Sequence, residues 1–217
     1  MKFLLVIAVT AGYLFMWPMT SPASDAGSAL ATQALEACTQ GRLATDRAIR
    51  LAYFQQGQTL GERAVAADEG NAETHFALFC NLGELLRIDG ESLTSIFGLR
   101  RMMHELDRAL EINPGYIDAM SAKGTLLVKL PSFLGGDSEK GEQLLQQVVW
   151  QAPKAVNARL ALAQVWCRHG RHDDAMVMAS DALALAEKLQ RVEFIPEAQA
   201  LLQQARASAI KVKHPRS

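Results

Sequence analysis

Residues 156–189 read VNARLALAQVWCRHGRHDDAMVMASDALALAEKL, and this stretch decides the fold. Apolar and small residues recur in it at intervals of three and four, which predicts two amphipathic helices, 156–169 and 173–189. Gly170 lies between them and tolerates the left-handed backbone of a tight turn between antiparallel helices. The stretch therefore predicts a helical hairpin. The positions at which its helices would touch are Leu162, Ala163, Trp166, Ala175, Ala179 and Ala182.

The break between two helices occurs three times in a similar form along the chain. In each copy an apolar helix end is followed by a break and by a new helix about six residues later. The segments are 63–76, 108–120 and 147–159, with breaks at Glu69, Pro114 and Pro153. Repetition at the length of a helical hairpin predicts a stacked array, in which each hairpin buries its core against its neighbours. Such arrays are usually binding scaffolds, so the repeats favour a binding function without naming the ligand.

Periodicity and end signals predict further helices on both sides of this hairpin. We expect them at 29–40, 46–68, 72–88, 94–112, 117–130, 139–150 and 196–209. Asp46 can cap the second helix, and Asp137 or Ser138 can cap the sixth. Gly57 and Gly61 weaken the second helix but allow another helix to approach it closely. The last helix has no partner repeat after it, so we expect it to cap the array.

The composition indicates one globular domain and excludes some classes of partner. The chain has 217 residues, 49% of them hydrophobic and only 6% aromatic, which favours helix over strand. Its net charge of −1 gives no overall field that would attract nucleic acid. Three cysteines are too few for a disulfide-framed fold, although a bridge between Cys38 and Cys80 is conceivable if the first helix packs on the third. The oligomeric state is left open.

The N-terminal segment has the layout of a secretory signal peptide. A lysine precedes an apolar run from Phe3 to Trp17, and the small residues Ser21 and Ala23 precede the expected cleavage point. The run is shorter than the roughly twenty residues that span a bilayer. We therefore expect a signal peptide at 1–23 and a single mature domain at 24–217, exported to a bacterial periplasm. The alternative is an uncleaved anchor in the inner membrane, and membrane contact is expected only in that case.

The hairpin 156–189 resembles a tetratricopeptide repeat, and two longer copies at 72–114 and 117–153 depart from its thirty-four-residue period. The motifs AETHFALFCNLGELL, SIFGLRRMMHELDRALEINP and LPSFLGGDSEKGEQLLQQVV make the region of about 46–190 similar to a divergent bacterial exported group of such proteins. That group resembles the periplasmic repeat partners of tripartite ATP-independent periplasmic transporters. The resemblance implies an all-α fold of antiparallel hairpins stacked as a superhelix. It also implies binding of a protein or apolar ligand, with a transporter solute-binding subunit as one possible partner, and neither a catalytic centre nor a cofactor.

If the hairpins stack as tetratricopeptide repeats do, the first helix of each lines the concave face. This face would present a mixture of polar and apolar side chains that suits a peptide or a helix. The residues predicted to contact a protein partner are Phe76, Ser121, Thr125, Lys129, Asn157, Gln164 and Arg168.

An alternative function is the carriage of an apolar small molecule. The segment 94–112 looks like a helix inserted into the array, and it is rich in methionine. Flexible methionine side chains suit an adaptable apolar pocket. The predicted pocket residues are Phe97, Met102 and Met103.

An enzymatic function is the weakest hypothesis. Cys167, His169 and His172 fall within six residues, but they lie at a helix end and a turn, where polar residues are ordinary. We therefore predict no metal site. The segment GGDSEKG (135–141) lacks the order of a phosphate-binding loop, and no motif identifies a nucleophile, so we predict no catalytic residue.

Overall fold

The computed structural model describes residues 22–89 and 95–213. The predicted signal segment therefore lies outside the described residues, apart from its last two. The described parts consist of α-helices joined by turns, with two short 3-10 helices, and contain no strand. The elements are α1 (Pro22–Leu43), α2 (Arg47–Ala67), α3 (Ala72–Asp89), α4 (Ser95–Ile112), α5 (Ile117–Lys129), η1 (Ser132–Leu134), α6 (Ser138–Gln151), α7 (Val156–Arg168), α8 (His172–Lys188), η2 (Val192–Phe194) and α9 (Ile195–Lys213).

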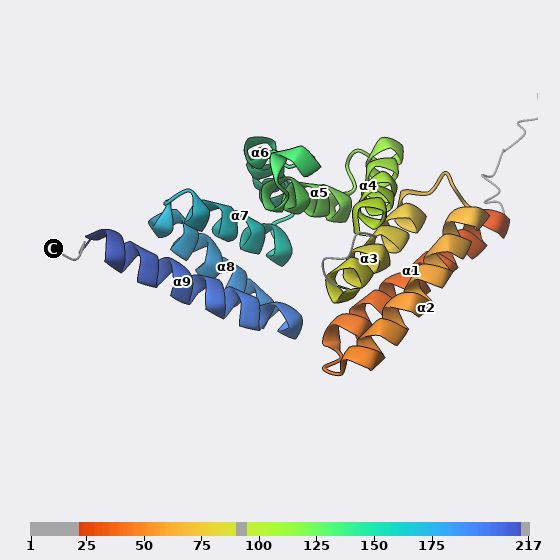
Figure 1. The fold of residues 1–217 in the computed structure, drawn as a ribbon, viewed down its shortest axis with the longest axis horizontal. Coiled ribbons are helices and arrows are strands. Elements are labelled where there is room, and N and C mark those ends of the chain that lie inside the picture. Colours follow the sequence, from red (N-terminus) through yellow and green to blue (C-terminus); the bar gives the residue numbers. More distant parts are fainter. Residues whose placement is uncertain (1–21, 90–94, 214–217) are drawn as a thin grey trace, which may run out of the picture.

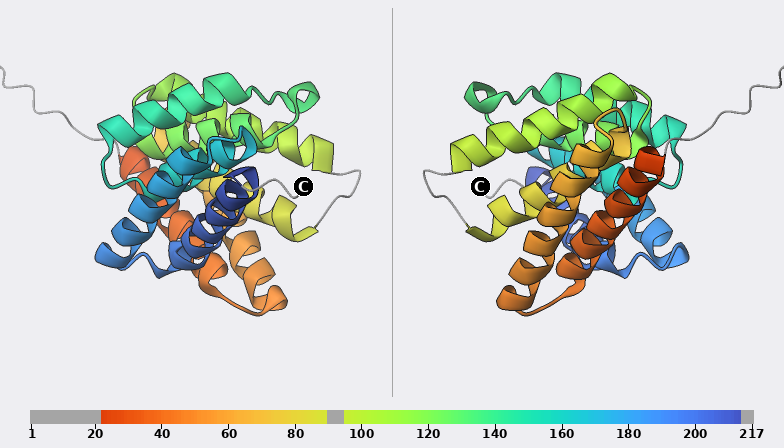
Figure 2. Two further views of the ribbon diagram at one scale, coloured as in Figure 1. Left: turned by 90° about the vertical axis from the view of Figure 1, so that its left-hand side faces the viewer. Right: turned by 90° about the vertical axis from the view of Figure 1, so that its right-hand side faces the viewer.

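The helices pack as consecutive antiparallel pairs, and each pair lies against the next (Figure 1). The hairpins are α1–α2, α3–α4, α5–α6 and α7–α8, while α9 packs along α8 at the C-terminal end. Figure 2 shows α1 and α2 side by side at one end of the array and α9 beside α8 at the other. The predicted stack of hairpins with a C-terminal capping helix is thus confirmed.

The α7–α8 hairpin has the construction that its sequence predicts. Its contact positions are small or apolar and buried, with Leu162 exposed by only 1% and Ala163, Ala175, Ala179 and Ala182 fully covered. Gly170 adopts a φ of +75°, and the Arg171 amide bonds back to the Trp166 carbonyl at 2.8 Å. This backbone bond closes the end of α7 with a left-handed residue, as a glycine allows.

Small residues bring α2 and α3 into close contact. Gly57 and Gly61 are buried on the side of α2 that faces α3. A Cβ atom at Gly61 would lie 2.8 Å from the Cα of Leu78, so only glycine fits at this separation of the helices. The Asp46 carboxylate caps α2 by accepting from two backbone amides, as expected.

The connection between α5 and α6 contains the glycine pair of the motif at 130–149. Gly135 adopts a φ of +90°, and a Cβ atom at Gly136 would overlap the carbonyl of Leu130. Asp137 then caps α6 by accepting from the Lys140 amide at 3.1 Å. Of the two residues predicted as this cap, the structure selects the aspartate.

The description of 94–112 as an inserted helix is wrong. α4 is the second helix of the second hairpin, and its stripe of Met102, Leu106 and Ala109 is buried in the core it shares with α3. A Cβ atom at Gly83 of α3 would lie 3.2 Å from the Met102 sulfur, which shows how closely the two helices approach. α3 and α4 are 18 residues each, against 13 and 17 in α7 and α8, and this departure from the repeat period made a regular second helix look like an addition.

None of the helices in the described ranges combines the length and the apolar character needed to cross a lipid bilayer.

Candidate partner-binding surface

The first helices of the third and fourth hairpins, α5 and α7, contact each other, and their C-terminal ends are tied together. The Arg168 guanidinium, at the end of α7, donates to the backbone carbonyl of Val128 in α5. Lys129, the next residue of α5, is exposed. Two cationic side chains therefore extend from the same end of this helix pair.

Neither of these cations is neutralised within the described part of the chain. The salt bridges there involve other groups, and no carboxylate lies within ion-pair distance of Lys129 or Arg168. Both residues are more than one-third exposed, so they are available to an anionic partner. A pair of unneutralised cations on adjacent helices attracts carboxylates and speeds their encounter.

Polar, half-buried residues continue along the same two helices. The Thr125 hydroxyl donates to the carbonyl of Ser121 at 2.8 Å, and the Asn157 side chain accepts from the amide of Ala158 at 3.0 Å. Gln164 is also half-buried. We call the set the α5–α7 face, and its members are Thr125, Lys129, Asn157, Gln164 and Arg168.

The other two predicted partner contacts lie in the interior. Phe76 is 8% exposed and packs against the rings of Phe79 and Tyr116, at centroid distances of 5.6 and 5.0 Å. Ser121 is 1% exposed, although it lies on the same side of α5 as Thr125 and Lys129. The open part of the predicted surface is therefore confined to the α5–α7 face.

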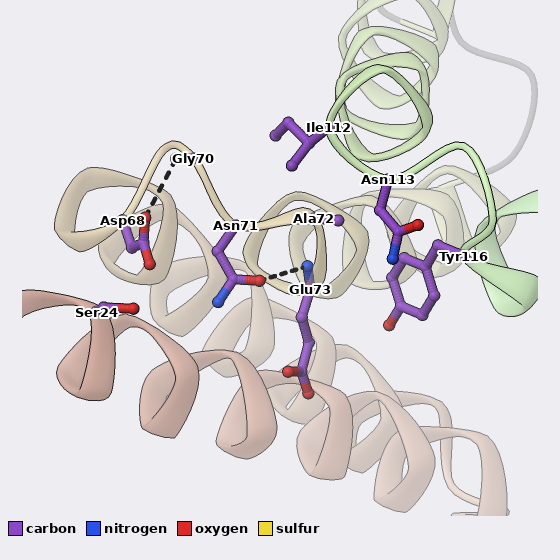
Figure 3. Close-up of a pocket in the computed structure, with 9 residues that line it drawn as sticks. All are labelled: Ser24, Asp68, Gly70, Asn71, Ala72, Glu73, Ile112, Asn113 and Tyr116. Atoms are coloured by element: carbon purple, nitrogen blue, oxygen red, sulfur yellow. Dashed lines mark hydrogen bonds between the residues drawn. The ribbon is translucent and has the colours of Figure 1, made fainter. Parts of the chain in front are cut away.

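Sequence reasoning did not single out a shallow depression at the turns between hairpins, shown in Figure 3. It has a volume of about 640 Å³ and opens widely to solvent. Its lining residues are Ser24, Asp68, Gly70, Asn71, Ala72, Glu73, Ile112, Asn113 and Tyr116. The repeated breaks at Glu69 and Pro114 mark these turns in the sequence, so the signal for this edge was present.

Most polar groups in this depression already serve the turns. The Asp68 carboxylate accepts from the Gly70 amide at 3.2 Å, and the Asn71 side chain accepts from the Glu73 amide at 2.9 Å (Figure 3). Burial and the nearby carboxylates of Asp118 and Glu73 raise the pKa of Tyr116, so its hydroxyl stays protonated. Their roles in the turns and helix caps explain why these polar residues are present, and they point to no particular ligand.

The three residues predicted to line an apolar pocket are not brought together. Phe97 is 76% exposed at the start of α4, whereas Met102 is 4% exposed and packs into the core. Met103 is half-buried, and its methyl group lies near Gly135 in the α5–α6 connection. The geometry of the described residues does not favour carriage of an apolar ligand between these side chains.

The histidines and the cysteine near the α7–α8 turn also occupy separate environments. Cys167 is buried, and burial raises the pKa of its thiol, which disfavours the nucleophilic thiolate. His169 lies near Glu142 and Ser138 of α6, at 3.8 and 3.4 Å. Over the described ranges, no three side chains of the metal-binding types converge on one point.

Comparison with known proteins identifies the fold. No protein-family model matches the chain, and no curated protein sequence matches it. The structure is similar to that of a thermophilic tetratricopeptide-repeat protein of Thermus thermophilus, with a TM-score of 0.54 and 20% identity over 81% of this chain and 99% of that one. YrrB, a tetratricopeptide-repeat protein described as having an unusual peptide-binding site, aligns at 13% identity over 76% of this chain and 92% of its own, with a TM-score of 0.34. The first likeness confirms the predicted tetratricopeptide-repeat fold.

Proposed function

We propose that this protein is an exported, non-enzymatic helical-repeat scaffold that binds a protein partner through its α5–α7 face. The observation that carries the proposal is the pair of exposed cations, Lys129 and Arg168, beside half-buried polar side chains on adjacent first helices. An extended or helical segment can lie along such a pair of helices and satisfy its polar groups on the side chains.

The chemistry of the face indicates an acidic partner segment. Carboxylates of the partner would meet Lys129 and Arg168, while amide and hydroxyl groups would pair with Gln164 and Thr125. Because the cations are exposed, binding should weaken as salt concentration rises. A solute-binding subunit of a transporter is one partner that fits an exported location, and export itself is inferred from the apolar run at Phe3–Trp17.

Charge reversal on the face is the decisive test. The purified protein is immobilised, exposed to the periplasmic fraction of its native cells, and washed with increasing salt. Lys129→Glu combined with Arg168→Glu should lower recovery of a specific partner by at least about ten-fold, which corresponds to about 1.4 kcal/mol. If the protein is exported, the protein itself should also be detected in the periplasmic fraction of those cells.

A matched control is Arg63→Glu combined with Lys188→Glu. These residues are exposed on α2 and on α8, outside the α5–α7 face, and the control changes the net charge by the same amount. It should retain the partner. Lys129→Glu alone preserves the bond between Arg168 and Val128, so it separates loss of charge from loss of the α5–α7 contact. If no partner copurifies with the unaltered protein, or if the face variant retains it, the proposal is wrong.

A further inference from the structure

Two cysteines lie opposite each other in the interface between α1 and α3. Cys38 is 1% exposed and Cys80 is 8% exposed, and both belong to one apolar cluster. The third cysteine, Cys167, lies in a different cluster on α7. Only the first two are therefore placed to react with each other.

Two hydrogen bonds, one on either side of Cys38 along α1, fix the α1–α3 contact. One turn before Cys38, the backbone carbonyl of Ala34 accepts from the side chain of Asn81, the residue after Cys80, at 2.9 Å. One turn after Cys38, Arg42 donates to the carboxylate of Glu84 at 2.7 Å. Ala34, Cys38 and Arg42 follow one another at single-turn intervals on the same side of α1. The first and last are anchored to α3, which holds Cys38 against that helix.

The two thiols also interact directly. The interaction between the two thiols lowers the pKa of Cys80 and raises that of Cys38. The nearby guanidinium of Arg42 also favours the thiolate of Cys80. The folded structure therefore places the two sulfurs side by side, where a disulfide can join them.

We propose that Cys38 and Cys80 form an intramolecular disulfide that fastens α1 to α3 when the protein folds in an oxidising compartment. The pair joins the first hairpin to the second across a contact already fixed by Asn81 and Arg42. Cross-linking residues so far apart in sequence restricts the unfolded chain and stabilises the folded one.

The oxidant is a small disulfide or an oxidised dithiol protein. One of the two cysteine thiolates attacks one sulfur of the oxidant, forms a mixed disulfide and releases one thiolate. The other cysteine then loses its proton to solvent, and its thiolate attacks the protein sulfur of the mixed disulfide and expels the second thiolate. Two protein thiols are oxidised, and one external disulfide is reduced to two thiols. Because both cysteines are buried in the folded protein, the exchange occurs before α1 has docked on α3.

The test uses the purified protein refolded from denaturant with oxidised glutathione, then unfolded and alkylated. The expected product has one alkylated cysteine out of three, and a non-reducing peptide map links the peptides that contain Cys38 and Cys80. The oxidised protein should melt about 5–10 °C above the form treated with dithiothreitol.

Cys167→Ala is the matched control and should keep both the cross-link and the difference in melting temperature. Cys38→Ala and Cys80→Ala should each abolish both. Alanine is chosen instead of serine because a serine hydroxyl would be buried at these positions and could prevent folding. Three alkylated cysteines after oxidative refolding would overturn the proposal. A glutathione adduct on Cys80 without a cross-link, or a disulfide between two chains, would overturn it as well.

Discussion

His75 is held in the interior by two hydrogen-bond acceptors. Its Nδ1 lies 2.7 Å from the Glu105 carboxylate, and its Nε2 lies 2.9 Å from the backbone carbonyl of Glu69. Because both neighbours only accept, the protonated ring is the form that satisfies them together. The bond to Glu105 raises the pKa of His75 most, and the Glu69 carbonyl raises it further, against the opposing effects of burial and of Arg108. One charged side chain thus links α3 to α4 and to the turn before α3.

This pair predicts a specific dependence of stability on pH. A histidine pKa that is raised in the folded state stabilises the protein fully below the unfolded value of about 6.5, and the effect disappears as pH rises through the folded value. Glu105→Gln removes the charge but keeps the shape. It should lower the free energy of unfolding by about 1–3 kcal/mol at pH 6, with a smaller loss at pH 9.

Urea unfolding of both proteins at several pH values measures the effect. The exposed Glu36→Gln on α1 is the control and should change the unfolding free energy by no more than about 0.5 kcal/mol at any pH. A Glu105→Gln deficit that stays constant from pH 6 to pH 9 would show that His75 is not protonated in the folded protein.

At the scale of helices, the sequence predicted where each helix begins and ends far better than which side chains the neighbouring helices bury. Asp46, Pro114 and Gly170 act within a few residues of where they stand, so helix boundaries follow from local chemistry. The burial of Phe76 and Ser121 depends on which helices pack over them. The sequence around each residue does not show which helices those are. The same limit applies to α4, whose place as a second helix is defined by contact with α3.

The candidate site shows the same division. That α5 and α7 are first helices followed from the repeat, and Thr125, Lys129, Gln164 and Arg168 are half-buried or exposed on them. Their contact with a partner stays a prediction. The bond from Arg168 to a backbone carbonyl of α5 was not predictable, because it depends on the distance between two helices.

The contact between α2 and α3 gives a test at this scale. Gly61→Ala places a methyl group 2.8 Å from the Cα of Leu78, where backbone rather than a flexible side chain must move. We expect a loss of about 1–3 kcal/mol in the free energy of unfolding, although alanine is the better helix former. Thermal unfolding followed by circular dichroism measures it.

Gly70→Ala provides the comparison for that test. Gly70 lies in the exposed turn between the same two helices, and the nearest atom to an added Cβ is an Asp68 oxygen at 3.5 Å. The substitution should leave stability nearly unchanged. Equal effects at the two positions would mean that the helices do not approach as closely as the structure shows.

Across the whole molecule, each hairpin packs its apolar residues against the next one. The elements at the two ends of the stack must therefore cover apolar side chains that have no further hairpin beside them. α9 covers the last hairpin with Ala198, Leu201, Leu202 and Ala205, which are all buried. Its opposite side, including Gln203 and Gln204, is exposed. One face of α9 thus continues the stack and the other ends it in solvent, as a capping element requires.

Removing the inward side chains of α9 should therefore uncouple the end of the array. Leu201→Ala combined with Leu202→Ala deletes two buried side chains at its contact with α7 and α8, and each leucine costs about 2–5 kcal/mol where the site cannot collapse. We expect a markedly lower melting temperature, binding of a hydrophobic dye, and concentration-dependent association through the uncovered face of the last hairpin. Gln203→Ala combined with Gln204→Ala, on the same helix turn, should preserve both the melting temperature and the elution volume in size-exclusion chromatography. Because only the covering function distinguishes the two pairs, equal behaviour would mean that α9 lies against the array without stabilising it.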